Sequence, residues 1–327
     1  MFHLLLSAML CVTPVDLSKR LPITDDYDKA VSIAKVFDKP MIVLFTGSDW
    51  DVDSQRFIHR VLNEGTFYEV LKKEFVFAHI DFPELETHKA KVIERNTKLK
   101  TKFQVESFPM LVLLDTDQNE ISRAGLFSED PEQLAAHLKS LLCRYREIEK
   151  GLALKTIDTE RLKYLYTDAK ELGASNILSR LLERGLEIDN DPYFQLEHYS
   201  NMLTRGLAQT AEATMMRQKI LAMDPDNTFG AHYRLAVLDF QSAAEDEKAS
   251  AETVVEPLLT YINKFGKSDT EHLWRLHMMV SQYLFSKGQM QTALDHARIS
   301  YQEAPSFMKH EVFQTLEYLK KEVASNS

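Results

Sequence analysis

Three aspartates at alternate positions are the first residues whose types and spacing suggest chemistry. Asp49, Asp51 and Asp53 lie in "SDWDVDS", directly after the apolar run "MIVLF". Alternating carboxylates are typical of a calcium loop between two helices, which also has Gly at its sixth position and Glu at its twelfth. Counted from Asp49, these positions hold Ser54 and Arg60. The sequence therefore predicts no metal site here.

Other candidate chemistry in the chain is weaker. Asp51 and Asp53 with His59 have the residue types of a hydrolytic or metal site, but Asp and His near one helix start are more often solvated caps. The sequence contains no His-Glu-x-x-His or Gly-x-Ser-x-Gly motif. We assign His79 to a strand, and we expect Cys143 to be a buried or half-buried thiol on a helix.

The elements that must position these residues alternate between about Asp25 and Leu142. "MIVLF" and "FVFAHIDF" have the continuous apolar character of buried parallel strands. "ESFPMLVLLD" and "ISRAGLF" predict a hairpin across the turn "DTDQNE". A helix follows, with Asp130 as its N-cap, Pro131 at its first position and a leucine stripe. This order predicts a mixed α/β sheet covered by helices.

After Lys150 the strand pattern gives way to consecutive helices. Pro192 and Pro225 are spaced close to the period of about 34 residues of a helical-hairpin repeat. The segment "MMVSQYLFSKGQMQTALDHARISYQEAP" resembles a tetratricopeptide repeat, with large and small residues where two packed helices need them. An irregular helical bundle without repeat ancestry is the alternative. The residues that match the tetratricopeptide repeat are Val280, Ser281, Leu284, Gly288, Ala293, Ser300 and Pro305.

The segment "KPMIVLFTGSDWDVDSQRF" resembles the thioredoxin-like superfamily, in its exported branch with a "FTGSDW" lead-in. In that family a Trp precedes a Cys-x-x-Cys pair at a helix start. Here Trp50 is present, but Asp51 and Ser54 occupy the positions of the pair. "QVESFPMLVLLD" resembles the strand whose proline, here Pro109, has a cis peptide bond facing the site. The resemblance covers roughly residues 23–145.

The resemblance implies a fold whose redox chemistry is absent. Thiol–disulfide exchange needs a thiolate and a resolving thiol, which Asp51 and Ser54 do not provide. Active relatives often carry a buried acid on the preceding strand, where this chain has Leu44 and Phe45. We therefore expect no catalytic residues, with Asp51 and Ser54 as degenerate positions. Trp50, Phe108 and Pro109 are the expected polypeptide-binding residues.

The length, the net charge and the N-terminal residues indicate the domains, partners and location of the chain. The 327 residues suit two domains, which we expect at 21–148 (thioredoxin-like) and 149–327 (tetratricopeptide-like). A net charge of −10 argues against a nucleic-acid partner. Residues 1–20 have the apolar core of a signal peptide, which would place the mature chain in the periplasm without a membrane segment, or in the cytoplasm if it is not cleaved. Lipid attachment at Cys11 is a further alternative.

Three functions remain open on the sequence. The first is a redox-inactive thioredoxin-like protein that binds proteins or peptides as a scaffold or chaperone-like module, without a cofactor. The second is a thiol–disulfide oxidoreductase or protein disulfide isomerase, as the family resemblance suggests. The third is an inert domain retained for oligomerisation. The replacement of the thiol pair by Asp51-Val52-Asp53-Ser54 favours the first.

Overall fold

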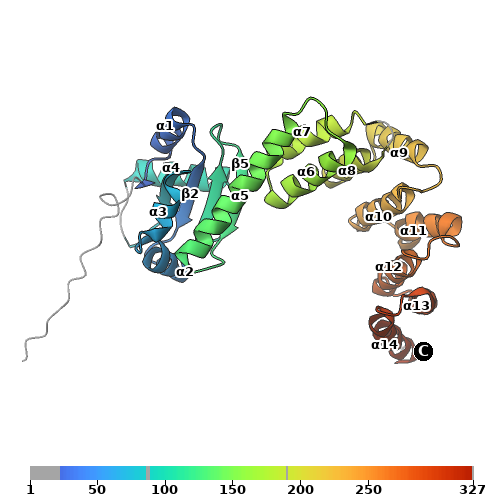
Figure 1. The fold of residues 1–327 in the computed structure, drawn as a ribbon. Helices are drawn as coiled ribbons and strands as arrows, with labels where there is room; N and C mark the ends of the chain where they lie inside the picture. The colour runs from blue at the N-terminus through green and yellow to red at the C-terminus, as the bar shows by residue number, and fades with distance from the viewer. Residues whose placement is uncertain (1–22, 86–88, 189–190, 326–327) are drawn as a thin grey trace, which may run out of the picture. The chain divides into compact units, whose positions relative to one another are not determined.

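The computed structural model describes residues 23–85, 89–188 and 191–325 (Figure 1). The expected leader, residues 1–20, lies outside the described residues. The chain divides into two compact units between Leu181 and Leu182. We describe each unit by itself.

A five-stranded mixed sheet forms the centre of the first unit, with the strand order β1-β3-β2-β4-β5. β2 and β1 both run parallel to β3, whereas β4 is antiparallel to β2 and β5 is antiparallel to β4. The two buried strands and the hairpin predicted from the sequence are confirmed. The short edge strand β1 was not predicted. The strands are β1 (Ile23–Thr24), β2 (Met41–Thr46), β3 (Val76–Asp81), β4 (Met110–Leu114) and β5 (Glu120–Gly125).

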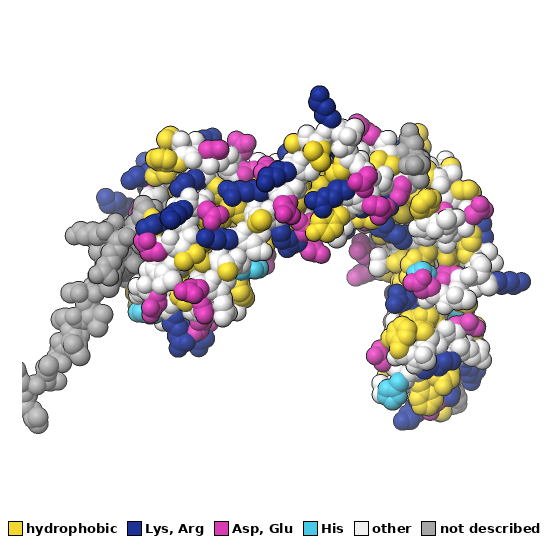
Figure 2. All heavy atoms as spheres, in the orientation of Figure 1, with side chains coloured by type: hydrophobic (Ala, Val, Ile, Leu, Met, Phe, Trp, Pro, Cys, Tyr) yellow, Lys and Arg dark blue, Asp and Glu magenta, His cyan; other side chains and the backbone are white. Residues whose placement is uncertain are grey.

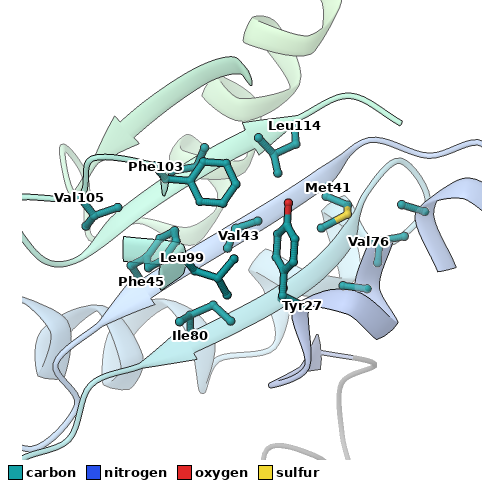
Figure 3. Close-up of a cluster of buried hydrophobic side chains, with 14 residues drawn as sticks. Tyr27, Met41, Val43, Phe45, Val76, Ile80, Leu99, Phe103, Val105 and Leu114 are labelled. Carbon is teal, nitrogen blue, oxygen red and sulfur yellow. The ribbon is translucent and has the colours of Figure 1, made fainter. Parts of the chain in front are cut away.

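One face of the sheet packs against α1 (Tyr27–Phe37) and α4 (Ala90–Lys102). Because side chains alternate along a strand, every second residue of β2 faces these helices, and Met41, Val43 and Phe45 do so. Figure 3 shows these side chains meeting Tyr27 and Leu99 in one apolar cluster.

The other face packs against α2 (Val52–Phe57), the π-helix η2 (Ile58–Leu62), α3 (Thr66–Leu71) and α5 (Pro131–Leu152). Phe67 of α3 joins the helices to the sheet, since its ring lies edge-on to Phe57 and to Phe77 of β3, with centroids 6.1 Å apart in both pairs. The continuous apolar character of β2 and β3 follows from this double coverage.

The start of α5 is confirmed as predicted. Asp130 is the N-cap, and its carboxylate accepts hydrogen bonds from the amides of Glu132 (2.9 Å) and Gln133 (3.1 Å). The helix continues to Leu152, so the expected domain boundary at residue 148 lies inside it. α6 (Thr159–Leu172) then packs on α5 within the same unit.

The second unit is all-α, and α7 (Ser175–Gly185) lies across the division. Ser281, in the middle of α12 (Leu273–Ser286), donates a hydrogen bond to the carbonyl of Ala293 near the start of α13 (Met290–Glu303), at 2.7 Å. Ser300, near the end of α13, donates to the carbonyl of Trp274 at the start of α12, at 2.8 Å. The two helices are therefore an antiparallel hairpin, which fits a helical repeat. The unit contains α8 (Tyr193–Thr204), α9 (Ala211–Met223), α10 (Ala231–Ala244), α11 (Ala251–Phe265), α12 (Leu273–Ser286), α13 (Met290–Glu303) and α14 (Lys309–Ser325).

The surface has no dominant sign of charge on the face that Figure 2 shows, where acidic and basic side chains are interspersed over both units. Among the described residues, none of the helices is both long and apolar enough to cross a bilayer.

Candidate functional site

The site predicted from the sequence lies where β2 ends and α2 begins. Asp51 is the N-cap of α2, and its carboxylate accepts a hydrogen bond from the amide of Ser54 at 2.7 Å. Ser54 is fully buried, and its hydroxyl accepts a hydrogen bond from the amide of Gly47 at 3.1 Å. Both residues at the positions of the expected thiol pair therefore stabilise the turn between strand and helix.

Trp50 belongs to a group of three aromatic rings at this turn. Its indole Nε1 donates a hydrogen bond to the carbonyl of Phe82 at 2.7 Å. Its ring lies edge-on to Phe108 with centroids 5.7 Å apart, and Phe82 and Phe108 are 5.4 Å apart. We call Trp50, Phe82 and Phe108 the aromatic platform. The structure thus brings together two of the three expected binding residues and adds Phe82, which the sequence analysis missed.

The exposure of the platform differs among its members. Trp50 is 43% exposed, while Phe82 and Phe108 are half-buried. The Phe108–Pro109 peptide bond is cis, and Pro109 itself is buried. Lys100 lies 5.1 Å from the centroid of the Phe108 ring, within the range of a cation–π contact. The platform is therefore an aromatic surface with one basic side chain beside it.

Gly47 is required at this turn because Trp50 packs directly against its backbone. A Cβ atom at position 47 would lie 2.6 Å from the indole ring, closer than carbon atoms approach without displacement. The glycine therefore leaves the space that the indole ring occupies.

The three alternating aspartates have separate roles. The Asp49 carboxylate accepts hydrogen bonds from the amides of Glu84 (2.9 Å) and Leu85 (2.6 Å), which ties the loop after β2 to the loop after β3. Asp51 caps α2, and the exposed Asp53 pairs with Arg56 at 3.3 Å. No cluster of His, Cys, Asp and Glu with the geometry of a metal site occurs within the described residues. The carboxylates organise the turn.

A polar network that the sequence analysis missed lies at the ends of β2 and β3. Thr46, fully buried, is in register with Asp81 and donates its hydroxyl proton to that carboxylate at 2.6 Å. Ser48 donates its amide (3.0 Å) and its hydroxyl to the same carboxylate. His79 Nε2 lies 2.7 Å from the Thr46 hydroxyl. Because Thr46 gives its only proton to Asp81, the Nε2 atom of His79 must carry the proton of that contact.

Burial lowers the pKa of His79, and the charges of Asp81 and Asp25 oppose this effect. The neutral imidazole is therefore the stable form, and the network has one anion, Asp81, held by three donors. The sequence signal was present: His79 and Asp81 alternate on one face of a strand. The missing information was the register that places Thr46 opposite Asp81.

The expectation for Cys143 was wrong. Its thiol is exposed on α5. The buried stripe of α5 contains Leu138, Leu141, Leu142 and Tyr145, and Cys143 projects from the helix outside this stripe. His59, on η2, is exposed as well.

The fold and the turn define a thioredoxin-like domain. The family described as "Thioredoxin-like domain" matches residues 27–142, and these residues carry the mixed sheet and its covering helices. An all-α region follows this domain in the chain.

Known proteins resemble the chain over different lengths. It is 28% identical over 304 residues to the "Thioredoxin-related protein DsbJ" of Chlamydia pneumoniae, covering 90% of this chain and 86% of that protein. It is 25% identical over 118 residues to the "Disulfide bond reductase DsbH" of the same organism, covering 36% of this chain and 71% of that protein. A solved structure titled "DsbH Oxidoreductase" shares 25% identity over 36% of this chain and 83% of its own, with a TM-score of 0.35.

Proposed function

We propose that this chain is a redox-inactive thioredoxin-like protein that binds polypeptides as a scaffold or chaperone-like module. The proposal rests on the residues at the two positions where the family has its cysteines, which are Asp51 and Ser54 in this chain. Exchange requires a thiolate that attacks a disulfide and a second thiol that resolves the mixed disulfide. Asp51 instead caps α2, and Ser54 is buried against Gly47. Neither side chain forms or breaks a sulfur–sulfur bond.

The proposed contact surface is the aromatic platform. Rigid aromatic side chains lose little conformational entropy on binding and contribute much of the energy of protein interfaces. Trp50 is held by its hydrogen bond to Phe82 and is still 43% exposed. Phe108 stands edge-on beside it. The platform suits an apolar segment of an extended polypeptide.

Trp50 also reports binding at this surface. A Trp274→Phe variant of the full chain keeps Trp50 as its remaining tryptophan, since the chain has two. We expect the Trp50 emission to change on titration with reduced, carboxymethylated insulin B chain, which lacks tryptophan. Phe108→Ala in this background should weaken binding about tenfold, the usual scale for loss of an aromatic anchor.

The control is Phe37→Ala, which removes an exposed aromatic side chain (65% exposed) from α1 of the same unit. It should bind the B chain like the parent protein. Equal affinity of the Phe108→Ala variant and the parent would contradict the proposed role of the platform.

A thiol–disulfide oxidoreductase or protein disulfide isomerase is the second candidate, favoured by the exposure of Cys143. Such an enzyme would use the Cys143 thiolate to attack a disulfide and release one substrate thiol. A thiol from another molecule, such as glutathione, would then have to release the substrate. Cys143→Ser tests this candidate, because it removes the thiol and alters nothing in the buried stripe of α5.

Export and the role of the helical region are also part of the proposal. We place the mature chain in the periplasm after removal of residues 1–20, with the thioredoxin-like domain followed by a helical region that acts as a tetratricopeptide-like binding module. Intact mass of the protein recovered from periplasmic and cytoplasmic fractions tests cleavage. Retention of the full-length mass in both fractions would contradict export by a cleaved leader.

A further inference from the structure

A hollow of about 480 Å³ lies in the second unit, between the α9–α10 and α11–α12 connections. Its walls include the rings of Phe229, Tyr233, Tyr261 and Phe265. Tyr233 stands edge-on to Tyr261 with centroids 5.8 Å apart, and Tyr261 lies 5.3 Å from Phe265. The hollow is thus lined by four aromatic rings, one from the α9–α10 connection and three from α10 and α11.

The loop that presents Phe229 is held in place from within. Asp224 is 2% exposed, and its carboxylate accepts hydrogen bonds from the amides of Phe229 (3.1 Å) and Ala231 (2.9 Å). Asn227 donates to the Tyr261 hydroxyl at 3.0 Å, which links the loop to the opposite wall. Phe229 nevertheless remains 53% exposed. The backbone that carries this ring is therefore held in place, and little ordering of the loop is required when a ligand binds.

The lining carries three carboxylates and one titratable base, His272, which lies beside Asp269 and Glu271. Asp226, Asp269 and Glu271 line the hollow, and none of the described lining residues is Lys or Arg. Asp269 faces inward, where it accepts hydrogen bonds from the Tyr261 hydroxyl (2.7 Å) and the amide of His272 (2.8 Å). Asp226 is exposed, and the exposed Glu271 carboxylate lies 3.7 Å from Nε2 of His272.

Two basic side chains approach from outside the hollow. Lys264 lies 4.7 Å from the centroid of the Phe265 ring, and Arg275 lies 5.3 Å from that of Trp274. Neither is among the lining residues. Tyr233 is already engaged, because its ring lies 4.0 Å from that of His272 and Arg275 hydrogen-bonds to its hydroxyl. The exposed ring of Phe229 and the exposed carboxylates remain for a ligand.

We infer that this hollow binds an arginine side chain of a partner polypeptide. A guanidinium group stacks on aromatic rings and pairs with carboxylates through its planar set of donors, so it satisfies both features of the lining at once. An anionic or purely apolar group would face the carboxylates without compensation. The inference concerns a site in the helical unit and holds whether or not the thioredoxin-like domain has redox activity.

Two blocked heptapeptides of glycine and serine, with a central arginine in one and citrulline in the other, test this assignment. Citrulline keeps the size and most hydrogen bonds of arginine but lacks its charge. Binding of the full chain to each immobilised peptide is measured by surface plasmon resonance. We expect the arginine peptide to bind at least tenfold more tightly, and we expect added salt to weaken this binding.

Variants locate the binding. Phe229→Ala and Glu271→Gln should each weaken binding of the arginine peptide severalfold. The controls Phe307→Ala and Glu303→Gln change matched exposed residues of the same unit and should leave this binding unchanged. Because all four side chains are exposed, the variants should fold like the parent, which circular dichroism checks. Equal binding of the two peptides, or equal losses in the target and control variants, would overturn the assignment.

Discussion

A histidine pair between α12 and α13 predicts that acid destabilises the second unit. His277 Nδ1 and His296 Nδ1 lie 2.9 Å apart, and the His277 side chain is largely buried. Burial and the neighbouring His296 lower the pKa of His277 to about 4. Burial also lowers the pKa of His296, and Asp295 opposes this effect. In the neutral pair one ring donates to the other, whereas two protonated rings would repel each other.

The direction of the effect follows from proton linkage. The unfolded chain binds a proton at His277 with a pKa near 6.5, and the folded chain does so only near pH 4. Acid therefore favours the unfolded state in this interval. The free energy of unfolding should be unaffected by this group above about pH 6.5 and should fall as the pH decreases toward 4. The full pKa difference of His277 between the folded and unfolded states corresponds to ~3 kcal/mol in the free energy of unfolding. Because His296 is half-buried and solvent screens the pair, we expect a loss of ~1–2 kcal/mol.

Urea unfolding at pH 7.5 and pH 4.5 measures this loss. A Trp50→Phe background leaves Trp274, at the start of α12, as the fluorescent reporter of the second unit. His277→Gln removes the titrating group and keeps a hydrogen-bonding partner for His296. On acidification, the free energy of unfolding of the variant should fall by ~1–2 kcal/mol less than that of its parent. The exposed His310→Gln is the control and should behave like the parent. Equal losses in the parent and in His277→Gln would refute the reasoning.

Three further predictions concern the turn between β2 and α2. Asp51→Ala should lower the free energy of unfolding of the first unit by ~1 kcal/mol because the N-cap is lost, and Asp51→Asn should retain most of it; equal losses in urea unfolding would argue against capping. Gly47→Ala should displace the Trp50 ring and shift its emission to longer wavelength, and an unchanged spectrum would contradict the close contact. Thr46→Val should lower the free energy of unfolding by ~1–3 kcal/mol because the Asp81 carboxylate loses the Thr46 hydroxyl as a donor, whereas Thr46→Ser should be tolerated.

Local signals explain what the sequence predicted correctly. Asp130 followed by Pro131 and a leucine stripe defines the start and the buried face of α5, and each signal depends only on residues within about one or two helical turns. The apolar runs of β2 and β3 predict buried strands for the same reason. Two residues of β1 are too few to show any periodicity, so this strand was not predicted.

Features that depend on distant contacts were not predictable. The Thr46, His79 and Asp81 network exists because β2 and β3 pair in one register, which the residue pattern does not specify. Phe82 joins the platform through its backbone carbonyl, which accepts the hydrogen bond of Trp50, and through its ring contact with Phe108. The exposure of Cys143 could have been inferred from the leucine stripe of its own helix, because the thiol lies outside the stripe.

Insulin reduction by the purified mature protein tests the central claim most directly. The wild type is compared with Cys143→Ser and with the double variant Asp51→Cys/Ser54→Cys, which restores the thiol pair at the start of α2. The account predicts that the wild type and Cys143→Ser are silent and that the double variant gains exchange activity. An active wild type whose activity is abolished by Cys143→Ser would identify the exposed thiol as a nucleophile and contradict the proposed redox inactivity.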